Sequence, residues 1–131
     1  MSRMKKPLHI KKDLKAMTSA LVFAGISKNV AKALACIALS KEVLSRDIEG
    51  VTGLRQPEVS LSVQELRRMG WASKRDIKKA GKGRPIHAYR LSIPFSKIID
   101  EIEARENAKL AKIKDNLKVL RGYVSSVSQE P

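Results

Sequence analysis

The sequence contains a single cysteine, Cys36, in 131 residues, and few aromatic side chains. One cysteine excludes an intrachain disulfide, and its place in the apolar run VAKALACIAL predicts a small buried side chain. Aromatic residues make up 4% of the chain, too few for a stacking platform that binds single-stranded nucleic acid. One cysteine and two histidines also give no plausible dedicated metal site.

Long apolar runs are missing as well. No stretch approaches the roughly 18 consecutive apolar residues that a membrane span needs. The basic N-terminus lacks the apolar core of a signal peptide, because Leu8–Ile10 is short and Asp13 and Lys15 interrupt the run that follows. We therefore expect a cytoplasmic, nucleoid-associated protein with no membrane partner.

Catalytic motifs are absent from the sequence. The serines have no neighbouring histidine and acid in a recognisable arrangement, and the acids after residue 95 alternate with Lys and Arg, as on a solvated helix face. The tripeptide at Gly81–Gly83 lacks the GxxxxGK[ST] spacing of a phosphate-binding loop. We expect a non-enzyme with no cofactor.

Positive charge is abundant. The formal net charge is +14, and the basic residues concentrate at 74–90 and in the N-terminal arm, whereas 95–131 is nearly balanced. Such a charge on a short chain favours a polyanionic partner through long-range attraction and counterion release. The alternative is that the charge only keeps the protein soluble.

The first half of the chain predicts short helices and one short strand. Ser27 is a good N-cap residue, and Ser45 could cap the helix that starts after it. Small apolar residues at three- and four-residue spacing indicate one buried face for each of the first two helices. The expected elements are a basic arm at Met1–Lys12, a helix capped by Asp13 that ends near Ala24, a helix at Lys28–Ser40, a strand at Val43–Leu44 and a helix at Arg46–Thr52.

Residues 46–91 have the order of a winged helix-turn-helix. Gly53 can turn the chain with positive φ, and Pro57 suits the start of a second helix that stops at Gly70. Within that helix the positions at i, i+4 and i+7 should face the core, namely Val59, Val63 and Leu66. A hairpin at Trp71–Leu91 with a basic, glycine-rich tip then completes the pattern.

This layout predicts two sets of DNA-binding residues. A recognition helix enters the major groove N-terminal half first, and its glutamine amides can read adenine edges. The basic hairpin tip can contact phosphates or the minor groove. The candidates on the recognition helix are Arg55, Gln56, Ser60, Leu61, Gln64 and Arg68, and those on the wing are Lys74, Arg75, Lys78, Lys79, Lys82 and Arg84. An ordinary amphipathic helix with a solvated polar face is the alternative.

Residues 25–91 resemble the winged-helix domain of MarR, ArsR and archaeal TrmB-like transcriptional regulators. The resemblance rests on Asp47-Ile48, Gly53-Leu54, the stretch Pro57–Trp71, and a wing pattern at Gly83-Arg84-Pro85 and Tyr89. It implies that the helix after the glycine turn reads the major groove and that the wing grips the flanking backbone or minor groove. The chain differs from TrmB proper in having no segment long enough for a sugar-binding domain.

The segment at about Phe95–Val124 predicts one long helix, because no Gly or Pro interrupts it before Gly122. Its apolar residues have the 3-4-3-4 spacing of a coiled-coil seam, and the step of eight from Ile102 to Leu110 breaks the heptad phase. The helix could fold back on its own domain, but pairing with a second copy is favoured. The predicted dimerisation residues are Ile99, Ile102, Leu110, Ile113, Leu117, Leu120 and Val124.

The sequence thus predicts a mainly α protein with a small β-hairpin wing: a winged helix-turn-helix followed by a long C-terminal dimerisation helix. The expected domains are an arm at 1–12, a DNA-binding domain at 13–93, a dimerisation helix at 94–124 and a tail at 125–131. We expect a homodimeric transcriptional regulator that binds double-stranded DNA sequence-specifically. A non-specific architectural nucleoid protein and an adaptor for protein or RNA stay open, and the operator, the effector and the sign of regulation are not encoded in any motif.

Overall fold

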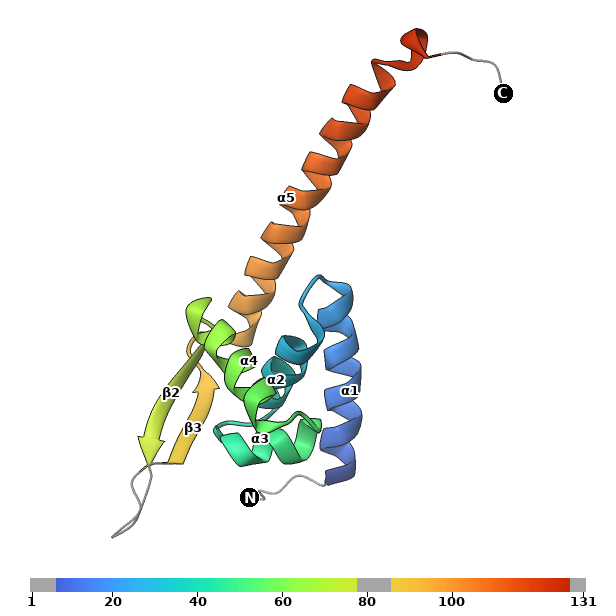
Figure 1. The fold of residues 1–131 in the computed structure, drawn as a ribbon. Helices are drawn as coiled ribbons and strands as arrows, with labels where there is room; N and C mark the ends of the chain where they lie inside the picture. Colours follow the sequence, from blue (N-terminus) through green and yellow to red (C-terminus); the bar gives the residue numbers. More distant parts are fainter. Residues whose placement is uncertain (1–6, 78–85, 128–131) are drawn as a thin grey trace.

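A computed structural model describes residues 7–77 and 86–127 of the chain. Three short helices and a small sheet form a winged-helix domain, α1 packs against α2, and α5 projects from the domain (Figure 1). The predicted fold class, mainly α with a β-hairpin wing and a long C-terminal helix, is confirmed. The elements are α1 (Pro7–Phe23), α2 (Lys28–Leu39), β1 (Val43–Leu44), α3 (Ser45–Thr52), α4 (Gln56–Arg68), β2 (Ala72–Ile77), β3 (Ile86–Leu91), α5 (Phe95–Arg121) and a 3-10 turn η1 (Val124–Ser126).

The three strands form an antiparallel sheet in the order β1-β3-β2. The hairpin of β2 and β3 runs in register from the pair Ala72–Leu91 to the pair Ile77–Ile86. The short strand β1 joins its other side, with Val43 opposite Tyr89. This one-rung strand before the helix-turn-helix was predicted, and it ties the hairpin to the start of α3.

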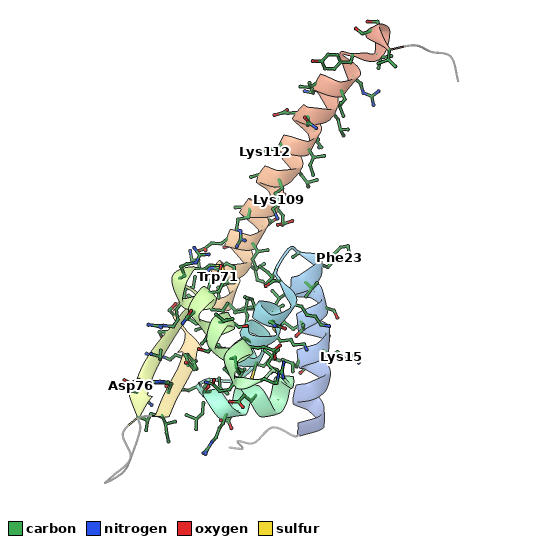
Figure 2. All side chains as sticks on the ribbon, viewed as in Figure 1. Lys15, Phe23, Trp71, Asp76, Lys109 and Lys112 are labelled. Atoms are coloured by element: carbon green, nitrogen blue, oxygen red, sulfur yellow. The ribbon has the colours of Figure 1, made fainter. Side chains whose placement is uncertain are left out.

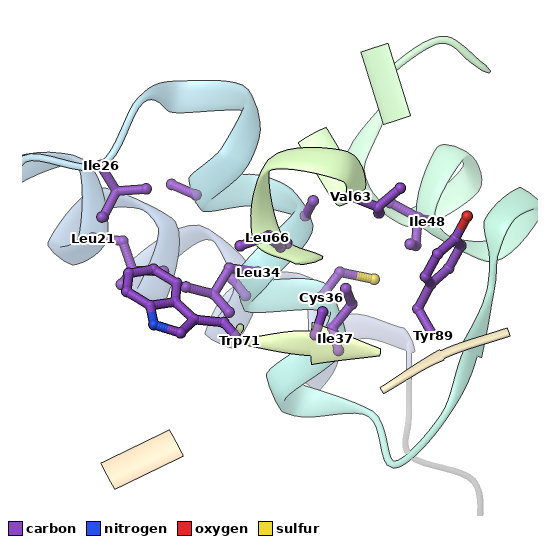
Figure 3. Packing of buried hydrophobic residues seen from close by; sticks show 14 of the residues in the cluster. Leu21, Ile26, Leu34, Cys36, Ile37, Ile48, Val63, Leu66, Trp71 and Tyr89 are labelled. Atoms are coloured by element: carbon purple, nitrogen blue, oxygen red, sulfur yellow. The ribbon is translucent and has the colours of Figure 1, made fainter. Parts of the chain in front are cut away.

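The hydrophobic core lies between α2, α3, α4 and the sheet (Figure 3). Leu34, Ile48 and Leu66 have no exposed surface, and Trp71 is 1% exposed. The predicted core positions of α4 are all buried. Cys36 is buried as predicted, and its burial raises the pKa of the thiol to about 11, so it remains protonated at neutral pH.

Two of the predicted helix starts are wrong. α1 begins at Pro7 and not at Asp13, because proline with its fixed φ suits a first helical position and outweighs the capping preference of aspartate. α3 begins at Ser45 with Leu44 as its N-cap residue. The Leu44 backbone N–H donates to Oδ2 of Asp47 at 3.3 Å, which is the half of a capping box that the third helical residue supplies, whereas no N-cap side chain bonds the first turn.

The turn between α3 and α4 has the predicted geometry. Gly53 adopts φ +80°, a left-handed conformation that disfavours residues with a Cβ. The Thr52 hydroxyl donates to the Ile48 carbonyl and accepts the Leu54 N–H at 3.1 Å, and the Arg55 N–H donates to Oε1 of Glu58 at 2.8 Å. These bonds fix the direction in which α4 leaves the turn.

The long helix α5 has two different halves. Near its base, Ile98 is fully buried and Ile102 is 5% exposed, and both belong to the core of the domain. Beyond them the helix extends away from the domain, so it does not fold back on it (Figure 1). Across the described residues, the helices are too short or too polar to cross a bilayer.

Candidate nucleic-acid interface

The two faces of α4 separate as the sequence predicted. Four side chains, Val59, Ser62, Val63 and Leu66, are buried against the domain. Away from that face Leu61 is 67% exposed, Gln64 is exposed and Ser60 is partly exposed, and Gln56 is exposed in the first turn, seven residues before the buried Val63. The exposed side therefore offers two amides, one hydroxyl and one apolar side chain, a set that can hydrogen-bond base edges and contact a thymine methyl group.

The arginines at the two ends of α4 have different surroundings. Arg55 is exposed just before the helix, where its backbone N–H donates to Glu58 and its carbonyl accepts the Val59 N–H. Arg68 is also exposed, but its guanidinium donates two hydrogen bonds to the Glu65 carboxylate, one of them from Nε to Oε1 at 3.0 Å. These bonds lower the pKa of Glu65, so both groups are charged at neutral pH and partly neutralise each other.

The two predicted DNA-binding residues of β2 also differ in whether an acidic side chain pairs with them. Lys74 is exposed and has no ion pair within 7–77 and 86–127. Arg75 makes a two-pronged pair with Glu42, from Nε to Oε2 at 2.9 Å and from Nη2 to Oε1 at 2.8 Å. The hydrogen bonds from Arg75 lower the pKa of the Glu42 carboxyl. The other predicted wing residues, Lys78, Lys79, Lys82 and Arg84, lie outside the described residues.

A polar cluster that the sequence did not predict joins α5 to the end of α4. The Trp71 indole Nε1–H donates to Oε1 of Glu101 at 2.7 Å. The Arg105 guanidinium lies 5.8 Å from the centre of the Trp71 ring and contacts the Met69 sulfur at 3.8 Å. Figure 2 shows Trp71 at the base of α5. Trp71 and Glu101 are 30 residues apart, so no local pattern could have paired them.

Two further polar features lie on the hairpin and in α4. Asp76 and His87 are opposite each other in the sheet, and His87 Nδ1 lies 2.8 Å from Asp76 Oδ1. Ser62 is 3% exposed, because it lies three residues after Val59 and four before Leu66 on the buried face of α4. For the described ranges, no group of three or more His, Cys, Asp or Glu side chains could hold a metal ion.

The predicted dimerisation residues fall into three groups. Leu110, Ile113, Leu117 and Leu120 lie on one face of α5 and are between 52% and 57% exposed. Ile99 is 41% exposed, and Val124 lies beyond the helix in η1 at 53% exposure. Ile102 instead packs into the core of its own domain, because α5 needs an apolar face toward α1 at its base.

Comparisons with known proteins found similar solved structures, whereas no protein-family model and no curated protein matches the sequence. A possible transcriptional regulator from Methanosarcina mazei Go1 is 13% identical with a TM-score of 0.58, over 82% of this chain and 85% of that one. TrmBL2, an archaeal chromatin protein, is 18% identical with a TM-score of 0.54, over 90% of this chain and 44% of TrmBL2. A third structure, of a transcriptional regulator, is 15% identical with a TM-score of 0.53, over 91% and 78%.

These likenesses concern the fold. This chain spans less than half the length of TrmBL2, and all three identities are under a fifth. Together with the helix-turn-helix, the one-rung strand and the antiparallel hairpin, they show that the chain has the winged helix-turn-helix fold expected from its resemblance to such regulators.

Proposed function

We propose that this protein is a DNA-binding transcriptional regulator that reads sequence with α4 and acts as a homodimer. The observation that carries the proposal is the exposed face of α4. Gln56, Leu61 and Gln64 are presented to solvent by a helix whose other face is locked into the core. A fixed row of amides beside a basic hairpin, on a chain of net charge +14, suits the major groove of duplex DNA.

The exposed seam of α5 supports the dimer. Leu110, Ile113, Leu117 and Leu120 form an apolar stripe on the outer half of α5, which no other element of the described chain covers. Contiguous apolar surface of this kind usually marks an interface. Pairing two copies along it would present two copies of α4 to a roughly two-fold-symmetric site.

Selection of bound fragments from random duplex DNA tests sequence reading. We expect an enriched motif, and we expect Gln56→Ala or Gln64→Ala to weaken binding to it by about 1–3 kcal/mol with little effect on random DNA. Asn107→Ala is the matched control, because it removes an exposed amide from α5. Equal losses on both kinds of DNA would contradict base reading by α4.

The hairpin should bind phosphates without reading bases. Lys74→Ala is expected to weaken binding to all sequences alike. It should also reduce the salt slope, that is, the slope of the logarithm of the binding constant against the logarithm of salt concentration, by roughly one. Lys79→Ala and Arg84→Ala at the tip should do the same. Arg75→Ala should reduce the slope less, because its guanidinium already bonds Glu42. A change in sequence preference in any of these variants would argue against backbone contact.

An architectural protein that coats DNA is the second candidate. The charge of +14 favours it, and the winged-helix fold is shared with TrmBL2, which is described as a chromatin protein. This candidate predicts no enriched motif at any salt concentration. The same selection experiment therefore separates the two candidates.

A further inference from the structure

A groove lies between α1, the first half of α2 and the end of α3. Its volume is about 610 Å³, and none of its lining residues comes from α4 or from the hairpin. Leu14 and Val51 contribute apolar walls, and three lysines line it: Lys15, Lys28 and Lys32. Figure 2 shows Lys15 on α1, the helix farthest from the hairpin in that view. No Asp or Glu lines the groove.

The three lysines have no partner within the described part of the chain. None of them takes part in an ion pair or a side-chain hydrogen bond there. Lys28 and Lys32 are four residues apart in α2, so their like charges repel and slightly destabilise that helix. Lys28 also occupies the first turn of α2, where the helix dipole disfavours a cation. This arrangement costs folding stability and leaves three positive charges unneutralised.

One hydroxyl in the groove wall is buried. The Thr18 Oγ1 atom has no hydrogen-bond partner among the described residues and almost no accessible surface, so a phosphate in the groove does not reach it. The three unpaired cations along the groove therefore carry the complementarity to the oxygens of a phosphate chain.

We propose that this groove binds phosphates of duplex DNA outside the stretch that α4 contacts. The inference rests on the proposed DNA-binding function and extends it to a second surface. Phosphate contacts need no sequence, so this surface adds affinity and salt dependence but no base preference. The phosphates come either from the flank of the same duplex or from a second duplex that the protein bridges to the first.

The test compares two triple variants of the full chain. The groove variant carries Lys15→Gln, Lys28→Gln and Lys32→Gln. The control variant removes the same charge from exposed positions of α5, with Lys97→Gln, Lys112→Gln and Lys118→Gln. Each is titrated with a short duplex that covers only the selected motif and with a long duplex with flanks. Lysine acetylation with and without DNA reports directly which amines DNA covers.

For the groove variant we expect a salt slope on the long duplex about two to three units smaller, and roughly 10- to 100-fold weaker binding, with the motif unchanged. The control variant should lose less than one unit. Wild-type Lys15, Lys28 and Lys32 should be protected from acetylation by the long duplex. Loss of binding to the long duplex alone indicates flanking phosphates, whereas loss of co-precipitation of two differently labelled duplexes indicates bridging.

Thr18→Val is a control in the groove wall, because it removes the buried hydroxyl and keeps the shape and all three lysines. We expect an unchanged or higher melting temperature and binding to the long duplex like that of wild type. Equal behaviour of the two triple variants, or acetylation of all three groove lysines in the complex, would overturn the groove proposal while motif binding persists. Loss of the proposed function itself would appear differently, as wild-type protein that binds neither duplex.

Discussion

The two halves of α5 are built from similar residues and have opposite environments. In the first half Ile98 and Ile102 are buried, and in the second half Leu110, Ile113 and Leu117 are at least 52% exposed. The first half finds its partner in its own domain, so it stabilises the fold. The second half finds none in its own described chain, so its apolar residues contribute to stability only when another molecule covers them. The first half of α5 therefore stabilises the domain, and we propose that the second half mediates assembly.

The strongest test of the comparison is a charge on the exposed half. Leu117→Lys would place an ammonium in the seam, and we expect the dimer dissociation constant to rise at least roughly 1000-fold, or about 4 kcal/mol. Affinity for the selected motif should fall with it, because two half-sites are no longer bound together. Light scattering measures the mass of the protein in solution and so distinguishes dimer from monomer. Val119→Lys is the control, since Val119 is equally exposed but lies off the seam. Wild-type protein that is monomeric at high micromolar concentration would contradict the assignment.

A substitution in the buried half of α5 should lower the stability of the fold and leave the dimer intact. Ile98→Ala is expected to lower the free energy of unfolding by about 3 kcal/mol through lost burial and the cavity it leaves. The mass of the folded protein should stay that of the dimer. Urea denaturation monitored by Trp71 fluorescence measures the first quantity and light scattering the second. A variant that dissociates without losing stability would show that the two halves are not separate in function.

At the junction with α4, Glu101→Ala removes the acceptor of the Trp71 indole N–H. We expect a loss of about 1 kcal/mol in unfolding free energy, because water reaches the exposed Glu101 side and partly replaces the bond. Glu103→Ala, two residues along the same helix, loses no hydrogen bond or ion pair to any described residue and should be nearly neutral. Thermal melts of the two variants, compared at one pH, decide whether the junction contributes to folding.

The smallest expected effect belongs to Arg105→Met, which keeps the aliphatic stem and removes the charge above Trp71. An exposed cation–π contact is worth about 0.5–1 kcal/mol, and we expect a loss near the lower end. The difference from wild type in melting temperature should shrink as salt is added. A difference that stays constant with salt would show that packing of the stem, and not the charge, holds Arg105 in place.

The order of elements could be predicted because each boundary has a local signal. Gly53, Gly70 and Pro94 mark ends or starts that the structure confirms within a residue or two. The recognition-helix core followed from the spacing of Val59, Val63 and Leu66. Local signals failed where two of them competed, as at Pro7 and Asp13, where the helix begins at the earlier one.

The interface was less predictable because it depends on pairs far apart in sequence. Sequence assigned Arg68 and Arg75 to DNA by charge alone, and the structure pairs them with Glu65 and Glu42. The phase break between Ile102 and Leu110 was visible, but its cause was not. It marks the point where α5 stops packing on its own domain. The roles of Arg68 and Arg75 toward DNA, and of the exposed half of α5 toward a second copy, remain predictions.

The bond between Trp71 and Glu101 has a mechanical consequence. It fastens the foot of a helix of 27 residues, about 40 Å long, to Trp71, three residues after the end of α4. A stiff rod clamped at its foot acts as a lever arm. A tilt of about 5° displaces the far end by about 3.5 Å, close to the spacing of one base pair. If two copies of the protein pair through the far ends of α5, a small change in the angle between the two helices would change the distance between the two copies of α4 by about one base-pair step.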